Sequence, residues 1–180
     1  ATDENNNRYR VTERILDVLK EKNVKAVFFV TMPYVKDQPD LVRRMIDEGH
    51  AVGNHSNNHP IMPDWSVDKM VYEIMSLHEY VLEHFGYEMT LFRFPTGEYS
   101  TRSLAVVQTL GYKSVHWSFA YADWDPNKQP ELEAAYNKVT GSHHSGAIYL
   151  LHAVSVTNAT ILGDSIDFFL AQGYELALFQ

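Results

Sequence analysis

The chain alternates short apolar runs with longer amphipathic stretches, and this alternation restricts the fold more than any other feature of the sequence. The apolar runs are rich in β-branched and aromatic residues and have the length of buried strands. They cover residues 24–31, 51–54, 90–94, 113–117, 147–151 and 176–179. We therefore predict six buried strands, each separated from the next by a polar or amphipathic segment.

The stretches around these runs carry apolar residues at helical spacing. They cover residues 11–22, 40–48, 66–85, 101–110, 131–140 and 159–172. Several are followed by a glycine that suits a helix end, at Gly49, Gly86, Gly111 and Gly173. Strands that alternate with helices predict an α/β fold with a parallel sheet, either a barrel or an open doubly wound sheet.

Composition narrows the class of protein further. With 180 residues, of which 45% are hydrophobic, the chain can bury one substantial core, so we predict one domain over residues 1–180. The net charge of -8 argues against nucleic-acid binding and against anionic membranes. The sequence has no cysteine, so a metal would have to be bound by His, Asp, Glu or water. No run is long enough to span a membrane, and the polar residues 1–7 do not form a signal peptide.

Residues that could bind a metal or act in catalysis cluster at the carboxyl ends of the predicted strands. His55 and His59 follow the second run, residues 93–97 end the third, residues 117–124 follow the fourth, and His152 ends the fifth. In a β/α barrel these ends share one face, whereas an open sheet gathers ligands mainly at one switch point. The distribution over four strands therefore favours a barrel.

His55 and His59 stand four positions apart after a short apolar strand, and they form half of a candidate metal site. Neutral imidazoles bind borderline divalent metals such as zinc. Pro60 disfavours the α conformation at His59, which places the pair in a turn at the strand exit. Spacing alone leaves a simpler alternative open, an exposed loop that contains two histidines.

Seven motifs in the chain, taken in their order, resemble those of the polysaccharide deacetylase family, which is also known as the NodB-homology family or carbohydrate esterase family 4. The motifs are FFVT at 28–31, VKDQP at 35–39, EGH at 48–50, GNHSNNHP at 53–60, RFPTG at 93–97, DW at 123–124 and GAIYLLH at 146–152. The resemblance extends over residues 11–179 and is nearest to the sporulation-type N-acetylmuramic acid deacetylases of peptidoglycan, which lead to muramic δ-lactam. It implies a distorted (β/α) barrel of about seven strands, whose first strand is absent from this sequence.

The resemblance also implies a role for each candidate residue in amide hydrolysis. His55 and His59 would hold zinc or another divalent metal ion, and a carboxylate of the first motif would be the base. His152 would be the general acid, and Asp123 would orient and charge it. Arg93 would steer the base carboxylate.

The remaining implied roles concern the substrate. Trp124 and Leu150 would wall the acetyl pocket, and the backbone N–H of Thr96 would face the oxyanion. Tyr99 lies near a strand end, where it could line a sugar cleft or pack as part of a lid. Read singly, His152, Arg93, Asp123 and Trp124 each have a structural alternative as a rim, ion-pair, turn-capping or core residue.

The chain departs from the family pattern at two points. Asp3, within Thr2-Asp3-Glu4, is either the base in a degenerate first motif, or the base and the first strand would lie before residue 1. Thr96 stands where related muramic-acid deacetylases often carry a basic residue, and its neutral side chain cannot pair with a lactyl carboxylate.

We therefore predict a metal-dependent hydrolase that removes N-acetyl groups from cell-wall glycan, with peptidoglycan as its partner, in the cell envelope or outside the cytoplasm of a bacterium. The alternatives are a catalytically impaired glycan-binding pseudoenzyme of the same fold, and a deacetylase of chitin oligomers or xylan. A phosphoesterase is disfavoured because the sequence has neither a glycine-rich phosphate cradle nor a Lys/Arg cluster.

Overall fold

The computed structural model describes the backbone of residues 4–178 and the side chains from residue 10 onward. Its internal contacts divide the chain into two compact units. Among the described residues, the sheet unit consists of 26–116 with 178, and the helical unit consists of 4–25 with 117–177. The prediction of one domain over residues 1–180 remains a prediction.

A parallel sheet organises the sheet unit. Strands β1 (Val27–Val30), β2 (Ala51–Asn54), β3 (Leu91–Phe92) and β4 (Lys113–Ser114) are hydrogen-bonded in the order β1-β2-β3-β4. All three pairings are parallel, and Val30 is paired with Asn54 and Asn54 with Phe92. The order of the strands in the sheet is the same as their order along the chain. The predicted α/β class with a parallel sheet is confirmed.

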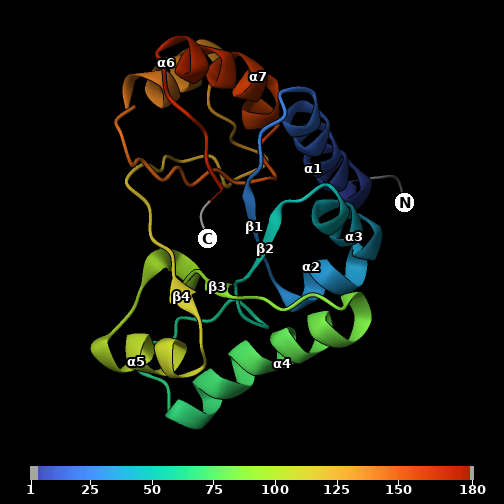
Figure 1. Ribbon diagram of the computed structural model, residues 1–180, viewed down its shortest axis with the longest axis vertical. Helices are drawn as coiled ribbons and strands as arrows, with labels where there is room; N and C mark the ends of the chain where they lie inside the picture. The colour runs from blue at the N-terminus through green and yellow to red at the C-terminus, as the bar shows by residue number, and fades with distance from the viewer. Residues whose placement is uncertain (1–3, 179–180) are drawn as a thin grey trace. The chain divides into compact units, whose positions relative to one another are not determined.

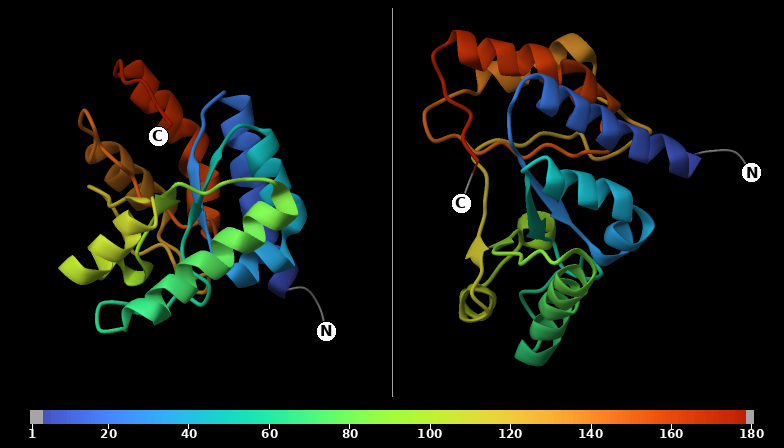
Figure 2. Two further views of the ribbon diagram at one scale, coloured as in Figure 1. Left: turned by 60° about the horizontal axis from the view of Figure 1, so that its bottom comes forward. Right: turned by 45° about the vertical axis from the view of Figure 1, so that its right-hand side comes forward.

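Helices connect the strands of this unit (Figures 1 and 2). They are α2 (Met32–Asp37), α3 (Pro39–Asp47), α4 (Val67–Phe85) and α5 (Thr101–Thr109), with a 3₁₀ turn η1 (Pro95–Gly97) after β3. Ser66 caps the start of α4 through its side chain, and Gly86 ends this helix in the left-handed region with φ of 64°. The core of the unit contains fully buried side chains from β2, β3, α3 and α4, including Val52, Phe92, Met45, Ile74 and Leu77.

The helical unit contains three long helices around a second core. Helices α1 (Glu4–Glu21) and α6 (Leu132–Gly141) each pack against α7 (Val156–Ala171), as Figure 2 shows. A salt bridge of 2.5 Å joins Lys22 Nζ to Asp167 Oδ2, just beyond the end of α1. Buried apolar side chains form the centre of this core: Phe119, Tyr121, Ala135, Val139, Ile161 and Phe169.

Two predicted strands do not form within residues 4–178. The run 147–151 makes only an isolated parallel bridge between Phe119 and Tyr149, and the described part of the run 176–179 contains no strand. An apolar run indicates which side chains are buried, whereas a strand also needs a neighbouring segment with which its backbone forms a series of hydrogen bonds. The described residues therefore hold four strands in one sheet, where six runs and a barrel of about seven strands were predicted; closure into a barrel remains a prediction.

The other boundaries differ in length. The predicted strands 24–31, 90–94 and 113–117 shorten to four, two and two residues, and α2 was not among the predicted helices. Helix α2 begins directly after Thr31, with Pro33 in its first turn. A proline is tolerated there because the backbone N–H groups of the first turn have no partner within the helix.

Candidate active site

The loop that carries His55 and His59 begins where β2 ends, and the side chain of Asn54 fixes its first turn. Asn54 Nδ2 donates to the carbonyl oxygen of Ile74 at 2.8 Å and to Tyr112 Oη at 3.1 Å, and Asn54 Oδ1 accepts from the Ser56 N–H at 2.8 Å. Ser56 Oγ then accepts from the His59 N–H at 3.0 Å. These bonds hold a tight turn in which Ser56 and His59 both have positive φ.

This turn brings the two predicted metal ligands together. The ring centroids of His55 and His59 lie 4.7 Å apart with the rings nearly perpendicular. His55 is buried, whereas His59 is exposed. The prediction that the pair lies in a turn at the strand exit is confirmed.

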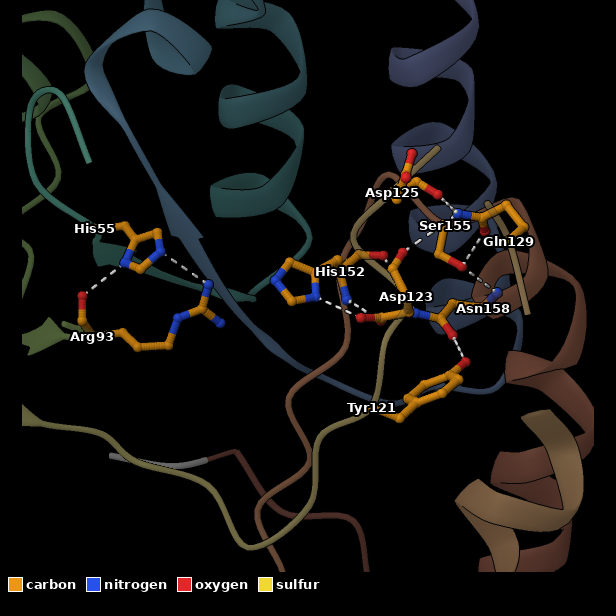
Figure 3. Close-up of polar contacts among 9 residues, drawn as sticks. All are labelled: His55, Arg93, Tyr121, Asp123, Asp125, Gln129, His152, Ser155 and Asn158. Atoms are coloured by element: carbon orange, nitrogen blue, oxygen red, sulfur yellow. Dashed lines mark hydrogen bonds and ion pairs between the residues drawn. The ribbon is translucent and has the colours of Figure 1, made fainter. Parts of the chain in front are cut away.

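Arg93, directly after β3, contacts His55 in two ways (Figure 3). His55 Nδ1 lies 2.7 Å from the Arg93 carbonyl oxygen, which can only accept, so Nδ1 carries the proton of the neutral ring. The same bond leaves Nε2 as the basic nitrogen, 3.2 Å from Arg93 Nη2. A backbone carbonyl that fixes the tautomer in this way is a common support for a metal-binding histidine. The Arg93 guanidinium also lies over the Phe29 ring, 5.0 Å from its centroid.

These residues fit part of a metal site. Two imidazoles in contact, one with its tautomer fixed, supply nitrogen donors that zinc and similar ions accept. Over the portion of the chain that the structure describes, no group of three or more His, Cys, Asp or Glu side chains is placed to bind a metal. Asp3, the predicted base, lies outside the described residues.

The turn after Arg93 has a strained backbone at Thr96. Thr96 has φ of 58°, a region that a β-branched residue rarely adopts, and Gly97 follows with φ of 78°. Thr96 Oγ1 donates to the Pro95 carbonyl oxygen at 2.6 Å, and the residue is exposed. Tyr99 is 51% exposed and its ring packs against those of Phe94 and His116. The predicted roles of Thr96 and Tyr99 in binding the substrate stay predictions.

In the helical unit, His152 and Asp123 form a close pair (Figure 3). His152 Nδ1 lies 2.7 Å from Asp123 Oδ1, and the His152 backbone N–H donates to Asp123 Oδ2 at 2.7 Å. The Asp123 carboxylate is completely buried, while the His152 side chain is 33% exposed. The contact therefore orients the ring with Nδ1 toward the carboxylate and leaves Nε2 on the far side of the ring.

A third donor completes the surroundings of Asp123. Asn158 Nδ2, in the first turn of α7, donates to Asp123 Oδ2 at 2.6 Å, and Tyr121 Oη donates to Asn158 Oδ1. Burial, and then the charge of Asp123, raise the pKa of Tyr121 to about 12. Tyr121 is thus a stable donor to Asn158, whose amide group is thereby oriented toward the carboxylate.

The capping residue of α7 supports this network. Ser155 Oγ accepts from the Asn158 N–H at 3.1 Å and donates to Gln129 Oε1 at 2.6 Å. Gln129 Nε2 in turn donates to the Asp125 carbonyl oxygen at 2.7 Å. The start of α7 and the loop after Asp123 are therefore joined by one chain of hydrogen bonds.

A cavity of about 530 Å³ lies beside this network within the helical unit. Trp124 lines it, is 59% exposed and has its ring centroid 6.2 Å from that of His152. Its other walls include Lys128 and Lys138. Leu150, half-buried, is held by a bond from its N–H to the Phe119 carbonyl oxygen and is not among the lining residues. An acetyl pocket walled by Trp124 and Leu150 stays a prediction.

Each unit thus contains one set of the site residues predicted from the sequence. The sheet unit contains His55, His59 and Arg93, with Thr96 and Tyr99 in the turn that follows, and the helical unit contains the His152–Asp123 pair beside Trp124. Sequence reasoning missed Asn158 and Glu73. Asn158 lies in a Ser155-x-x-Asn158 helix start, a common cap, and Glu73 is an acid on the apolar face of α4, which is a signal for a buried polar role.

In the sheet unit two imidazoles follow one strand of a parallel α/β sheet, and in the helical unit a histidine is paired to a buried aspartate. The family model of polysaccharide deacetylase matches residues 4–115. The chain belongs to the polysaccharide deacetylase family.

Several characterised proteins are similar to this chain. The peptidoglycan-N-acetylmuramic acid deacetylase PdaA of Bacillus subtilis is 44% identical over 91% of this chain and 62% of its own length. The peptidoglycan-N-acetylglucosamine deacetylase PgdA of Listeria monocytogenes is 34% identical over 92% of this chain and 34% of its own length. The chain therefore spans less than two thirds of these relatives.

Solved structures agree with the fold. The structure of B. subtilis PdaA, a family 4 carbohydrate esterase, matches 91% of this chain and 70% of its own with a TM-score of 0.87 and 43% identity. BA3943 of Bacillus anthracis, described as a pseudoenzyme of the same family, matches 92% of this chain and 58% of its own with a TM-score of 0.86 and 26% identity. The same fold thus occurs with and without activity.

Proposed function

We propose that this chain is a metal-dependent deacetylase that hydrolyses the N-acetyl groups of cell-wall glycan. The observation that carries the proposal is the His152–Asp123 pair, in which a buried carboxylate binds the imidazole and the backbone N–H of His152, each at 2.7 Å. Amide hydrolysis needs such a group, because the departing nitrogen is a poor leaving group until it gains a proton. Membership of the polysaccharide deacetylase family supports deacetylation as the reaction in which His152 would be the acid.

The residues divide the reaction between them. Bound by His55 and His59, zinc or a similar ion would polarise the acetyl carbonyl and lower the pKa of a water molecule. Arg93 holds His55 in the tautomer that leaves Nε2 basic, and we assign it the steering of the base carboxylate, with Asp3 as the candidate base. The Thr96 N–H is the proposed donor to the oxyanion.

His152 acts in the second half of the reaction. Its Nε2 proton passes to the amide nitrogen as the carbon–nitrogen bond breaks, so that water and the amide become acetate and a free amine. Asp123 and Asn158 keep the imidazole oriented throughout. Trp124, exposed beside His152, supplies an aromatic face suited to the apolar side of a sugar ring.

Peptidoglycan is the substrate that we propose. The relatives PdaA and PgdA are named as deacetylases of its N-acetylmuramic acid and its N-acetylglucosamine. Thr96 offers no charge to a lactyl carboxylate, so N-acetylglucosamine and chitin-like oligomers remain alternatives to muramic acid. An O-acetyl esterase acting on xylan is a further, less favoured alternative.

A location at the cell envelope or outside the cytoplasm follows from this substrate. Within residues 4–178, no helix has both the length and the apolar character needed to cross a membrane. We propose that the chain works on the glycan polymer itself and binds no nucleic acid, in keeping with its net charge of -8.

A second candidate function is a glycan-binding pseudoenzyme. Two observations favour it: no third metal ligand joins His55 and His59 in the described part of the chain, and BA3943, a pseudoenzyme of the same fold, is similar over 92% of the chain. A site with two imidazoles and no base would retain the glycan surface and lose turnover.

One substitution separates the two functions. For an enzyme, His152→Ala removes the acid, so we expect acetate release to fall by at least about 100-fold while glycan affinity stays within about twofold. The assay measures acetate from peptide-stripped peptidoglycan glycan and, in parallel, the Kd for the same glycan. His144→Ala, in an exposed loop of the helical unit, is the matched control. Equal affinity with no acetate from the parent chain would select the pseudoenzyme.

A further inference from the structure

Helix α4 places one acid on its apolar face. Met70, Ile74, Leu77 and Val81 of this face are buried, and Glu73 stands among them with only 4% of its surface exposed. A buried carboxylate is costly unless hydrogen bonds compensate for its lost hydration. The partners of Glu73 therefore indicate why an acid occupies this position.

Both carboxylate oxygens of Glu73 accept from Asn58, a residue of the loop that carries His55 and His59. Oε2 accepts from the backbone N–H of Asn58 at 2.7 Å, and Oε1 accepts from Asn58 Nδ2 at 2.8 Å. The Asn57 N–H donates to the Glu73 carbonyl oxygen at 2.9 Å. Three bonds thus attach one residue of α4 to the two residues that precede His59.

Other hydrogen bonds hold the loop as well, among them the one from the His59 N–H to Ser56 Oγ at 3.0 Å. Asn54 binds the Ile74 carbonyl oxygen and so attaches the beginning of the loop to the same helix, next to Glu73. His59 itself is exposed and has φ of 56°, a conformation that is uncommon for residues other than glycine. A residue in this conformation persists only when its neighbours hold it there.

We propose that Glu73 is a positioning residue for His59: its carboxylate clamps Asn58 and so holds the second imidazole in place for a metal ion. The role rests on the proposed function of His55 and His59 as metal ligands. Because the clamp consists of hydrogen bonds accepted by the side chain, a neutral glutamine can reproduce it if the Asn58 amide turns over. Glu73→Gln is therefore the conservative variant, and Glu73→Ala removes the clamp.

The test measures zinc binding by titration calorimetry on the whole chain, together with the thermal unfolding of each variant. We expect Glu73→Ala to weaken zinc binding by about 10- to 100-fold, the range found when the support of a metal ligand is removed, and Glu73→Gln to restore affinity to within about threefold of the parent. Glu83→Ala, an exposed acid on the same helix, is the matched control and should bind zinc as the parent does.

Hydrogen exchange of backbone amides provides a reading that needs no metal. Loss of the clamp should accelerate exchange at Asn58 in Glu73→Ala and leave it unchanged in Glu83→Ala. If Glu73→Ala does not fold, Asn58→Ala removes the side-chain half of the clamp from an exposed position and must weaken zinc binding in the same direction.

The outcomes separate this inference from the function on which it rests. A folded Glu73→Ala variant with the zinc affinity of the parent would overturn the positioning role and leave the metal site intact. A parent chain that binds no zinc would overturn the metal site and, with it, any role of Glu73 in placing a ligand.

Discussion

Single residues carry much of the candidate site, and Asp123 is the clearest case. Its carboxylate accepts from the ring and the backbone of His152 and from the side chain of Asn158, and it is completely buried. Removing a donor from a buried charged acceptor costs about 1.5–3 kcal/mol, because the acceptor cannot find water in exchange. The orientation of His152 therefore depends also on Asn158, whose side chain donates to Asp123 Oδ2 at 2.6 Å and to the His152 carbonyl oxygen at 3.4 Å.

Asn158→Ala should lower kcat for deacetylation by about 10- to 100-fold, the rate equivalent of that energy, with little change in KM. Steady-state kinetics on peptidoglycan glycan measure the effect. Asn127→Ala, in the exposed loop beyond Asp123, is the control and should keep the kcat of the parent. A parent-like kcat for Asn158→Ala would show that Asp123 does not need this donor.

The pairing of His152 with Asp123 was predictable, since the resemblance assigned both residues and the structure places Nδ1 2.7 Å from the carboxylate. Asn158 and Glu73 were not predicted, because their partners lie 35 and 15 residues away in sequence. Nothing in the local pattern around Asn158 distinguishes a residue that binds a carboxylate from an ordinary helix-start residue. The position of Glu73 on the apolar face of α4 indicated a buried polar role, but nothing in the sequence indicated that its partner would be Asn58.

At the scale of elements, the loops depend on how closely β1 and β2 approach each other. Gly53 in β2 faces the Phe29 ring of β1, and a Cβ at Gly53 would lie 2.5 Å from two atoms of that ring and 3.3 Å from the Leu91 carbonyl oxygen. Phe29 also underlies the Arg93 guanidinium and lies 6.5 Å from His55, measured between ring centroids. Only glycine fits between these strands without moving the ring that supports the site.

Gly53→Ala should lower the free energy of unfolding by about 1–3 kcal/mol, the usual cost of overpacking a core. Urea unfolding followed by circular dichroism measures the change. Gly141→Ala is the matched control, because nothing lies within 4 Å of its added Cβ, and it should be neutral or slightly stabilising. An unchanged midpoint for Gly53→Ala would mean that the Phe29 ring moves aside at no cost.

The sequence pattern predicted helices well and strands less well. Helices α3 to α7 lie close to the predicted ranges because an amphipathic period over nine or more residues is a local property. The runs 147–151 and 176–179 have the composition of strands, yet pairing depends on a neighbour that the run itself does not specify. Helix α2 was missed because its six residues are too short to establish a period.

At the scale of the whole molecule, each unit buries a tyrosine hydroxyl. Burial raises the pKa of Tyr112 in the sheet unit and of Tyr121 in the helical unit to about 12. An exposed tyrosine ionises near about 10. Because the folded-state pKa is the higher one, the stability that these groups contribute is fully present below about pH 10 and is lost as the pH rises through about 12.

The free energy of unfolding should therefore fall between about pH 10 and pH 12, and Tyr121→Phe should make this fall less steep by removing one of the groups that cause it. Urea unfolding at a series of pH values gives the slope. Tyr72→Phe, which changes a side chain that is 65% exposed, is the control and should follow the parent. If the slopes of Tyr121→Phe and the parent coincide, the hydroxyl of Tyr121 does not titrate differently on unfolding.

The proposed function also belongs to the scale of the whole molecule, because the loop with His55 and His59 belongs to one unit and the His152–Asp123 pair to the other. The proposed deacetylation uses both groups, whereas metal binding and glycan binding each use fewer parts. Only a measurement of the complete reaction reports on the two groups at once.

That measurement is acetate release from peptide-stripped peptidoglycan glycan by the parent chain, first with zinc, then with a chelator, and again after zinc is restored. We expect release with zinc, none with the chelator, and recovery on restoration, in agreement with a metal-dependent deacetylase. The absence of acetate from a folded chain that still binds zinc would contradict the deacetylase and assign this chain to glycan binding without cleavage.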